Sequence, residues 1–200
     1  MYTLYYMNGS CSLATLSVLN EIGVDGVKVV DKAKVDNYEH INPVGAVPAL
    51  TDGSTTLREG AALLLHLLDK HDNDLLSKEG KARQQAIEDI MFANATMHPA
   101  YGRLFFLDQA VEDDGVKGDL MNKAAAMISQ LWDVVELRLK DQDYLGGDKP
   151  SAADFMLTVY SRWGGFFPVD VVIPAKASKM IENVLARDSF VKALDMEKSV

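Results

Sequence analysis

Residues 1–31 read MYTLYYMNGSCSLATLSVLNEIGVDGVKVVD, and this stretch carries the pattern of a strand, a helix and a second strand. Residues 2–7 are rich in Tyr, Thr and Leu, which favour a strand, and the Asn-Gly-Ser sequence of residues 8–10 favours a turn. Apolar residues then recur at helical spacing over residues 13–22, and valines gather in residues 26–30. We therefore expect a βαβ unit, whose two strands are parallel and joined by a right-handed crossover.

The following segments extend this unit into an α/β domain. Residues 32–43 are polar and mixed, which indicates a loop or a short helix. Residues 47–50 and 55–57 flank the turn sequence Thr-Asp-Gly-Ser, so they predict a β-hairpin. An apolar helix is expected from Glu59 through Leu68, which makes the order βαβ followed by ββα.

The second half of the chain predicts helices only. They are expected at residues 83–107, 120–140, 151–163, 175–186 and in a short segment after residue 188. One apolar face of the second helix should consist of Leu120, Ala124, Met127, Leu131, Val134 and Leu137. Because a polar stretch separates the two patterns, we expect one domain over residues 1–75 and an all-α domain over residues 76–200.

Composition excludes several classes of protein. The formal net charge is −9, and the Lys and Arg residues are scattered, so we expect no nucleic-acid partner. The longest apolar run, residues 61–68, is far shorter than the roughly 20 residues that span a bilayer, so we expect no membrane partner. The single cysteine, Cys11, and four His residues without ligand spacing predict neither a disulfide nor a metal site. We expect a cytoplasmic protein, because a free thiol fits a reducing compartment.

Three motifs carry a family resemblance: residues 5–13 (YYMNGSCSL), residues 42–50 (NPVGAVPAL) and residues 57–60 (LREG). Their order and spacing resemble the N-terminal domain of cytosolic glutathione transferases, most nearly the bacterial beta class. Residues 149–154 (KPSAAD) resemble the capping box in the second domain of that family. The resemblance implies a thioredoxin-like, glutathione-binding N-terminal domain, an all-α substrate-binding C-terminal domain and a homodimer.

The resemblance also implies a glutathione site around Val47-Pro48. In thioredoxin-like folds this peptide bond is cis, and the exposed backbone of Val47 would pair with the cysteinyl part of glutathione. Val44 departs from the family pattern, in which a lysine is frequent at this position, and Lys32 or Lys34 would reach the glycyl carboxylate instead. Without the resemblance, Pro48 would be interpreted as an ordinary trans proline at the head of a strand.

Glu59 and Gly60 are expected at a helix N-terminus, where backbone N–H groups attract an anion and the Glu carboxylate can accept from an ammonium group. A free amino acid carries both charges, and the resemblance assigns this pair to the γ-glutamyl end of glutathione. The alternative for Glu59 is a solvated acid that only complements the helix dipole.

Cys11 lies at the N-terminal turn of the first helix, where the helix dipole is expected to lower the pKa of its thiol. The alternative is a buried and inert cysteine. The resemblance places Cys11 beside the glutathione sulfur, with which it could form a mixed disulfide. Catalysis requires a donor to the glutathione thiolate; Cys11 is the first candidate, Ser10 the next, and Tyr6 a third by position alone.

Further candidates lie in the helical domain. The resemblance points His98 into the cleft, while a structural His is the alternative. Met91, seven residues earlier, replaces the Asn of the family pattern, and Pro99 replaces the Lys that follows the His. An apolar pocket for an electrophile should be lined in part by aromatic residues. The candidates are Tyr101, Phe105, Trp163 and Phe166.

These observations favour an enzyme that conjugates reduced glutathione to hydrophobic electrophiles, with detoxification as its context. Glutathione would be its co-substrate and no metal would be needed. One alternative is a monothiol, glutathione-dependent reductase or peroxidase that uses Cys11. The other is a non-catalytic, transferase-like binding or regulatory protein.

Overall fold

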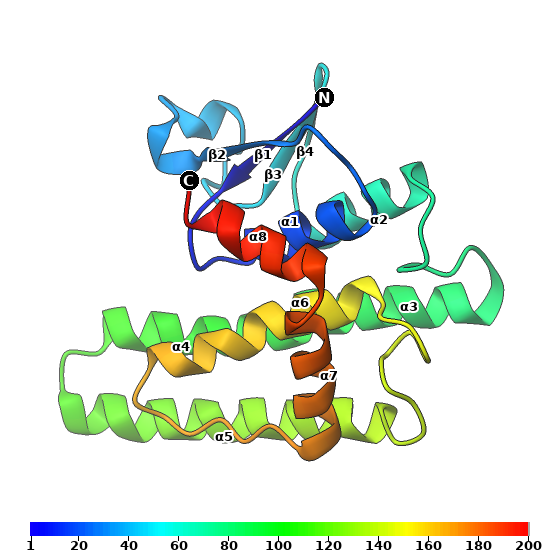
Figure 1. The fold of residues 1–200 in the computed structure, drawn as a ribbon. Helices are drawn as coiled ribbons and strands as arrows, with labels where there is room; N and C mark the ends of the chain where they lie inside the picture. Colours follow the sequence, from blue (N-terminus) through cyan, green and yellow to red (C-terminus); the bar gives the residue numbers. More distant parts are fainter. Residues whose placement is uncertain (200) are drawn as a thin grey trace. The chain divides into compact units, whose positions relative to one another are not determined.

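A computed structural model describes residues 1–199, which divide into two compact units (Figure 1). The first unit comprises Met1–Leu76 and the segment from Leu185 onward, and the second comprises Ser77–Val184. The regular elements of the first unit are β1 (Tyr2–Tyr6), α1 (Ser12–Glu21), β2 (Lys28–Asp31), β3 (Ala49–Asp52), β4 (Thr55–Leu57), α2 (Gly60–Lys70) and α8 (Asp188–Glu197). Two short 3₁₀ helices, η1 (Lys32–Lys34) and η2 (Tyr38–His40), occupy the segment expected to be a loop or a short helix.

The sheet of the first unit has the strand order β2-β1-β3-β4. Strand β1 pairs in parallel with β2 and antiparallel with β3, and Leu4 stands opposite Val29 on one side and Leu50 on the other. Alternate residues of β1 are buried, and α1 buries Leu13, Leu16 and neighbouring residues in the same unit. The thioredoxin-like, α/β class expected from the sequence is confirmed for this unit.

Helix α8 packs along α1 within the first unit, although it follows all the helices of the second unit in sequence. The Arg187 guanidinium forms an ion pair with the Glu21 carboxylate at the end of α1. The Asn20 amide also donates a hydrogen bond of 3.1 Å to the Ser189 carbonyl. Residues 188–197 thus pack with the α/β unit, whereas the boundary expected after residue 75 groups them with the helical domain.

The second unit consists of helices and loops. Its elements are α3 (Gly80–Phe92), the π-helical turn η3 (Ala93–Met97), α4 (His98–Ala110), α5 (Asp114–Arg138), α6 (Ala152–Ser161), the 3₁₀ helix η4 (Arg162–Phe166) and α7 (Ala175–Leu185). A single helix was expected over residues 83–107, and the π turn interrupts it directly before His98. Single-turn π segments within helices are frequent at functional sites.

Helix α5 buries a different face from the one expected. Its buried residues are Met121, Ala124, Ala125, Ile128, Trp132 and Val135. Of the expected face, Leu120, Met127, Val134 and Leu137 are exposed, by 37%, 51%, 42% and 73%. The helix has two apolar stripes, and packing against α4 selects which one is buried.

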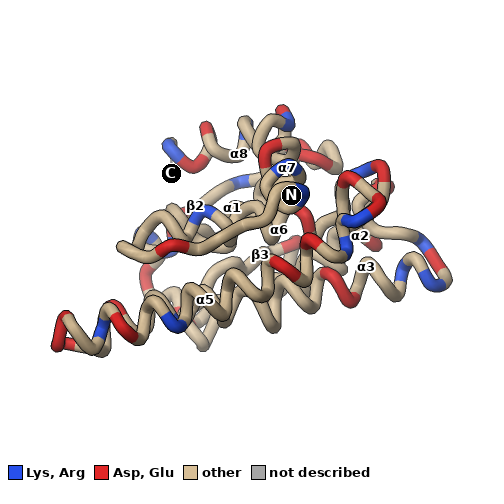
Figure 2. Tube along the Cα trace, turned by 90° about the horizontal axis from the view of Figure 1, so that it is seen from below, with Lys and Arg blue, Asp and Glu red and all other residues tan. Residues whose placement is uncertain are grey.

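Lys and Arg residues lie among Asp and Glu residues along helices α3, α5 and α8 (Figure 2). Within residues 1–199, none of the helices is both long and apolar enough to cross a membrane.

Two buried carboxylates join the helices of the second unit. Asp154 accepts hydrogen bonds from the N–H and the hydroxyl of Ser151, at 2.7 and 2.8 Å, and from the Leu145 N–H at 2.9 Å. Burial raises the pKa of Asp154 to about 6, although these hydrogen bonds oppose the shift. Asp89 of α3 is buried and forms an ion pair with Arg138 of α5. The capping box expected at residues 151–154 is therefore present.

Candidate functional site

Cys11 lies at the N-cap position of α1, directly after the loop that leaves β1. It is a free cysteine and only partly exposed, and its Sγ donates a hydrogen bond of 3.4 Å to the carbonyl of Val47. Burial raises the pKa of the Cys11 thiol to about 11, and the hydrogen bond from its own N–H offsets only part of this effect. The shift is thus opposite to the lowering expected at a helix N-terminus, because desolvation of the sulfur disfavours the thiolate.

The segment before β3 supplies the backbone that faces Cys11. The Val47-Pro48 peptide bond is cis, as expected, and Pro48 is buried while Val47 is half-buried. The preceding carbonyl of Ala46 accepts hydrogen bonds from the Asn42 amide at 2.8 Å and from the Tyr38 hydroxyl at 2.9 Å. These two bonds hold the segment so that the Val47 carbonyl stays within reach of the thiol.

Glu59 precedes α2 with an unusual backbone conformation. Its φ is 65° and its ψ is 109°, and its side chain is exposed. Positive φ is rare for a residue with a Cβ atom, and such strain is found mostly at functional positions. Gly60 begins α2, and the first N–H groups of a helix have no partner within the helix. Glu59 and Gly60 therefore combine a carboxylate with a helix N-terminus, as the sequence predicts.

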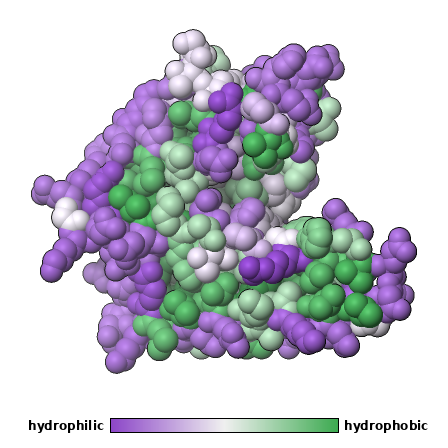
Figure 3. All heavy atoms as spheres, turned by 180° about the vertical axis from the view of Figure 1, so that it is seen from behind, coloured by the Kyte–Doolittle hydropathy of each residue, from purple (hydrophilic) through white to green (hydrophobic). Residues whose placement is uncertain are grey.

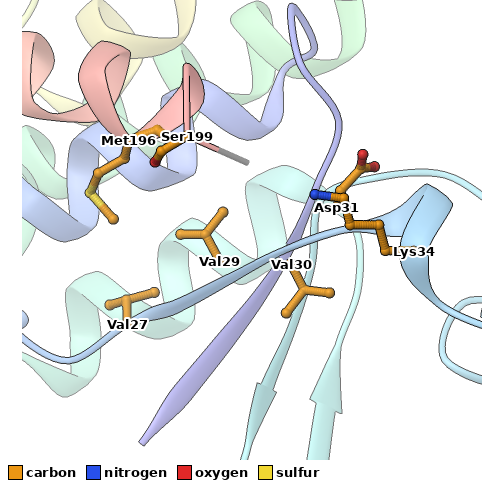
Figure 4. A pocket seen from close by; sticks show the side chains of 7 residues that line it. All are labelled: Val27, Val29, Val30, Asp31, Lys34, Met196 and Ser199. Carbon is orange, nitrogen blue, oxygen red and sulfur yellow. The ribbon is translucent and has the colours of Figure 1, made fainter.

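The two candidate lysines lie in different surroundings. The Lys32 ammonium donates a hydrogen bond of 3.0 Å to the Gly45 carbonyl, two residues before Val47. Lys34 instead lines a cavity of about 350 Å³ beside β2, together with Asp31 and with Met196 of α8 (Figure 4). In this cavity, Val29 of β2 points toward Met196 (Figure 4). Lys32 thus contacts the segment that leads to Val47.

The Ser10 hydroxyl is engaged within the first turn of α1. It accepts a hydrogen bond of 3.2 Å from the Ser12 N–H and donates one of 2.9 Å to the Ser12 hydroxyl, and both residues are buried. Ser10 therefore bonds to Ser12, the first residue of the helix, and precedes the N-cap residue Cys11.

The Tyr6 hydroxyl is buried and donates to the carboxylate of Glu197, the last residue of α8. The Gly9 N–H donates to the same Oε1 atom, at 2.9 Å. No sequence signal pointed to Glu197, because 188 residues separate it from Gly9.

His98 belongs to an aromatic cluster in the second unit. Its ring meets the rings of Tyr160 and Trp163 edge to face, with both centroid distances at 5.1 Å. Phe105 contacts Trp163 at 5.8 Å and Phe166 at 6.2 Å. Burial lowers the pKa of the His98 imidazole below its ordinary value of 6.5, so the ring is neutral at pH 7.

The four expected pocket residues differ in exposure. Tyr101 is fully buried, accepts a hydrogen bond of 2.9 Å from Trp132 Nε1, and thus lies in the core. Burial raises its pKa to about 12. Trp163 is also largely buried, whereas Phe105 is half-buried and Phe166 is 57% exposed. Apolar side chains reach the surface of this unit (Figure 3), and Phe166 is among those that water can contact.

In the part of the chain that the structure describes, no group of three or more His, Cys, Asp or Glu side chains has the arrangement of a metal site.

Comparisons of sequence and of structure with known proteins both find similarity to glutathione S-transferases. The family model for the N-terminal domain of glutathione S-transferases matches residues 4–75. A glutathione S-transferase of Xanthomonas campestris is 31% identical over 199 residues, covering 97% of this chain and 98% of its own length. A glutathione S-transferase structure from Xylella fastidiosa has a TM-score of 0.89 at 29% identity, covering 99% of both chains. A beta-class enzyme of Sphingomonas chungbukensis has a TM-score of 0.83 at 28% identity, covering 99% of this chain and 100% of its own.

Proposed function

The chain belongs to the glutathione S-transferase family, and we propose that its transferase reaction joins reduced glutathione to hydrophobic electrophiles. The observation that carries this proposal is the contact between the Cys11 thiol and the Val47 carbonyl, 3.4 Å apart and directly before the cis Pro48. It brings a thiol donor to the backbone on which the cysteinyl part of glutathione would lie.

The first unit offers a group for each part of glutathione. The γ-glutamyl end would lie at Glu59, whose carboxylate accepts from the ammonium group, and its own carboxylate would accept from the Gly60 N–H. The cysteinyl part would pair with the backbone of Val47. Lys32, which contacts the Gly45 carbonyl, supports binding of the glycyl carboxylate more directly than Lys34 does.

Cys11 acts in this proposal as a neutral hydrogen-bond donor. Because its pKa is about 11, the thiol keeps its proton at pH 7 and can donate to a glutathione thiolate. A donor to the charged form lowers the pKa of the bound glutathione thiol and raises its reactive fraction. The thiolate sulfur then forms a bond to the electrophilic carbon, whose leaving group departs with the electron pair. Both side chains donate a hydrogen bond in the structure, Ser10 to Ser12 and Cys11 to the Val47 carbonyl. Ser10 is buried whereas Cys11 is partly exposed, which favours Cys11 for this role.

Phe105, Trp163 and Phe166 are the proposed contacts of the electrophile. Their rings form one cluster with His98, and Phe166 is exposed. An apolar aromatic surface suits an aryl or alkyl electrophile. Tyr101 would support this cluster from the core, since its ring meets Trp163 at 6.1 Å.

A monothiol reductase is the second candidate, because the sole cysteine lies at the backbone expected to hold the cysteinyl part of glutathione. The Cys11 thiolate would attack the glutathione sulfur of a mixed disulfide and release the substrate thiolate, which leaves Cys11 bonded to glutathione. Reduced glutathione would then attack this new disulfide, release the Cys11 thiolate and leave as glutathione disulfide. Cys11→Ala separates the two reactions: it abolishes reduction, while conjugation survives at a lower rate. Cys11→Ser keeps a donor, so conjugation should stay closer to that of the wild type than with Cys11→Ala.

We further propose a cytoplasmic homodimer that acts in detoxification. A free cysteine and glutathione as co-substrate both suit a reducing compartment. The exposed apolar stripe of Leu120, Met127 and Val134 on α5 supports contact with a second copy of the chain.

Calorimetric titration with reduced glutathione tests the proposal. The wild type should bind it, and Glu59→Ala should weaken binding at least about tenfold, the loss of one charged hydrogen-bonded partner. Glu79→Ala is the matched control, because Glu79 is also an exposed acid at a helix N-cap, that of α3. A wild type that does not bind glutathione would favour a binding or regulatory protein instead. Equal weakening in both variants would remove Glu59 from the site.

A further inference from the structure

Glu197 is a buried acid at the last position of α8. Its side chain is 6% exposed, and Oε1 accepts from the Tyr6 hydroxyl and, at 2.9 Å, from the Gly9 N–H. Burial of a carboxylate is unfavourable unless donors compensate it. One donor, Tyr6, ends β1, and the other, Gly9, lies in the loop between β1 and α1.

This loop leads directly to Cys11. Strand β1 ends at Tyr6, Gly9 has a φ of 73°, and the Ser10 N–H closes a turn onto the Met7 carbonyl at 3.1 Å. Glu197 therefore holds the last residue of the strand and the residue two positions before Cys11. Fixing both points limits the positions that the thiol can take.

The other end of α8 is also anchored, so the Glu197 carboxylate has a defined place. Arg187 and the Ser189 hydroxyl both bond to the Glu21 carboxylate at the C-terminal end of α1. Since Glu197 bonds to the loop before the N-terminal end of α1, the two helices are tied at both ends. A helix tied at both ends cannot easily shift along its neighbour.

We propose that Glu197 is a positioning residue that holds the β1–α1 loop so that the Cys11 thiol faces the Val47 carbonyl. This inference rests on the proposed function only where it predicts catalysis. The position of the thiol can be measured independently, because Cys11 is the sole cysteine of the chain.

Alkylation of Cys11 by iodoacetamide, followed against pH, reports the surroundings of the thiol. In the wild type, burial raises the Cys11 pKa to about 11, so alkylation at pH 7.5 should be slow. Glu197→Leu removes the acceptor of the Tyr6 hydroxyl and the Gly9 N–H, loosens the loop and lets water reach the sulfur. Its alkylation at pH 7.5 should be at least about tenfold faster, equivalent to one pKa unit.

Conservative and control variants separate positioning from general destabilisation. Glu197→Gln keeps an Oε1 acceptor and should stay within about twofold of the wild-type rate, because a neutral oxygen still accepts both bonds. Asp195→Leu is the control, since Asp195 is an exposed acid on the same helix and should leave the rate unchanged. Tyr6→Phe removes one of the two bonds, so it should give a rate between wild type and Glu197→Leu, and it decides the question if Glu197→Leu does not fold.

All rates are measured well below the midpoint of thermal unfolding of each variant. Alkylation of Glu197→Leu, or of Tyr6→Phe in its place, at the wild-type rate would overturn the proposal. The proposal would also be overturned if Cys11 were alkylated as fast in Asp195→Leu as in Glu197→Leu.

Conjugation to an aryl chloride gives a second readout. Glu197→Leu should lower kcat about tenfold and leave the Kd for glutathione within about threefold, since Glu59 and Gly60 are on another element. In a Cys11→Ala background, the same substitution should change kcat less than threefold, because the two residues act on one group. An equal loss of kcat in both backgrounds would overturn the positioning role. If Glu197→Leu is alkylated faster than the wild type but the wild type has no transferase activity, the positioning role is supported and the proposed function is rejected.

Discussion

Two residues of the folded chain carry a local energetic cost: the backbone of Glu59 has a positive φ, and the sulfur of Cys11 is desolvated. Glu59 adopts a φ of 65°, and residues in such regions cost of the order of 1–3 kcal/mol each. Cys11 keeps its sulfur in a desolvated position that raises its pKa to about 11. Both residues belong to the candidate glutathione site, where binding geometry can outweigh local stability.

Substitution of Glu59 by glycine should separate stability from binding. Glycine has no Cβ and tolerates positive φ, so Glu59→Gly should raise the free energy of unfolding by about 1 kcal/mol. It should also weaken glutathione binding at least about tenfold, because the carboxylate is lost. Urea unfolding and calorimetry measure the two effects. A variant that loses stability would show that the Glu59 backbone is not strained.

Among the elements, α6 depends most clearly on a capping arrangement. Its N-cap residue Ser151 and its third residue Asp154 bond to each other, and the Leu145 N–H from the preceding loop bonds to the same carboxylate. All three residues are buried, so an unmatched donor or acceptor there is costly. The helix start and the loop before it thus form one structural unit.

Ser151→Ala should lower the free energy of unfolding by about 1 kcal/mol, because it removes the capping hydroxyl. Ser54→Ala, at an exposed turn between β3 and β4, is the control and should have little effect. Both changes are measured by urea unfolding at pH 7. If the Ser151→Ala variant is as stable as the wild type, the backbone hydrogen bonds to Asp154 are enough to hold the start of α6 without the Ser151 hydroxyl.

Asp154 should also make stability depend on pH. Its pKa is about 6 in the folded protein against an ordinary value of 3.8, so the folded protein binds the proton more tightly than the unfolded chain does. The resulting stabilisation is present below pH 4 and is lost as pH rises through 6. The shift corresponds to about 3 kcal/mol.

Comparing the wild type with Asp154→Asn isolates this effect from other titrating groups. The free energy of unfolding of the wild type, relative to the variant, should decrease between pH 4 and pH 7. Chemical unfolding at several pH values measures this difference. A difference that stays constant or increases with pH would contradict the raised pKa.

At the scale of the whole molecule, an exposed apolar stripe on α5 favours association between copies of the chain. Leu120, Met127 and Val134 are exposed and recur every seven residues on α5, so they lie on one side of that helix. A stripe of this kind on a helical unit is typical of a surface that contacts another protein. The proposed homodimer would bury it.

Sedimentation equilibrium should give twice the chain mass of 22.0 kDa for the wild type. Met127→Glu together with Val134→Lys should shift the protein toward the monomer, because charges would have to be buried in the interface. Val191→Lys changes an exposed apolar residue of α8 in the first unit and should leave the mass unchanged. A monomeric wild type would reject the homodimer.

Local sequence patterns were sufficient to predict most of the secondary structure of this protein. The strands, helices and capping box depend on residues within one or two turns of each other, so periodicity and turn residues revealed them. The motifs around Cys11, Val47-Pro48 and Glu59-Gly60 indicated the family and the cis proline, because each is a short segment with its own conformational requirement.

Tertiary structure alone decided the remaining features, because they depend on groups far apart in the chain. Packing of α4 selected the buried face of α5, and packing of α8 on α1 brought Glu197 to Tyr6 and Gly9 across almost the whole sequence. The direction of the Cys11 pKa shift followed from desolvation, which no local pattern reports. Sequence by itself therefore determined the family and the order of elements, whereas long-range packing determined the chemical state of the thiol.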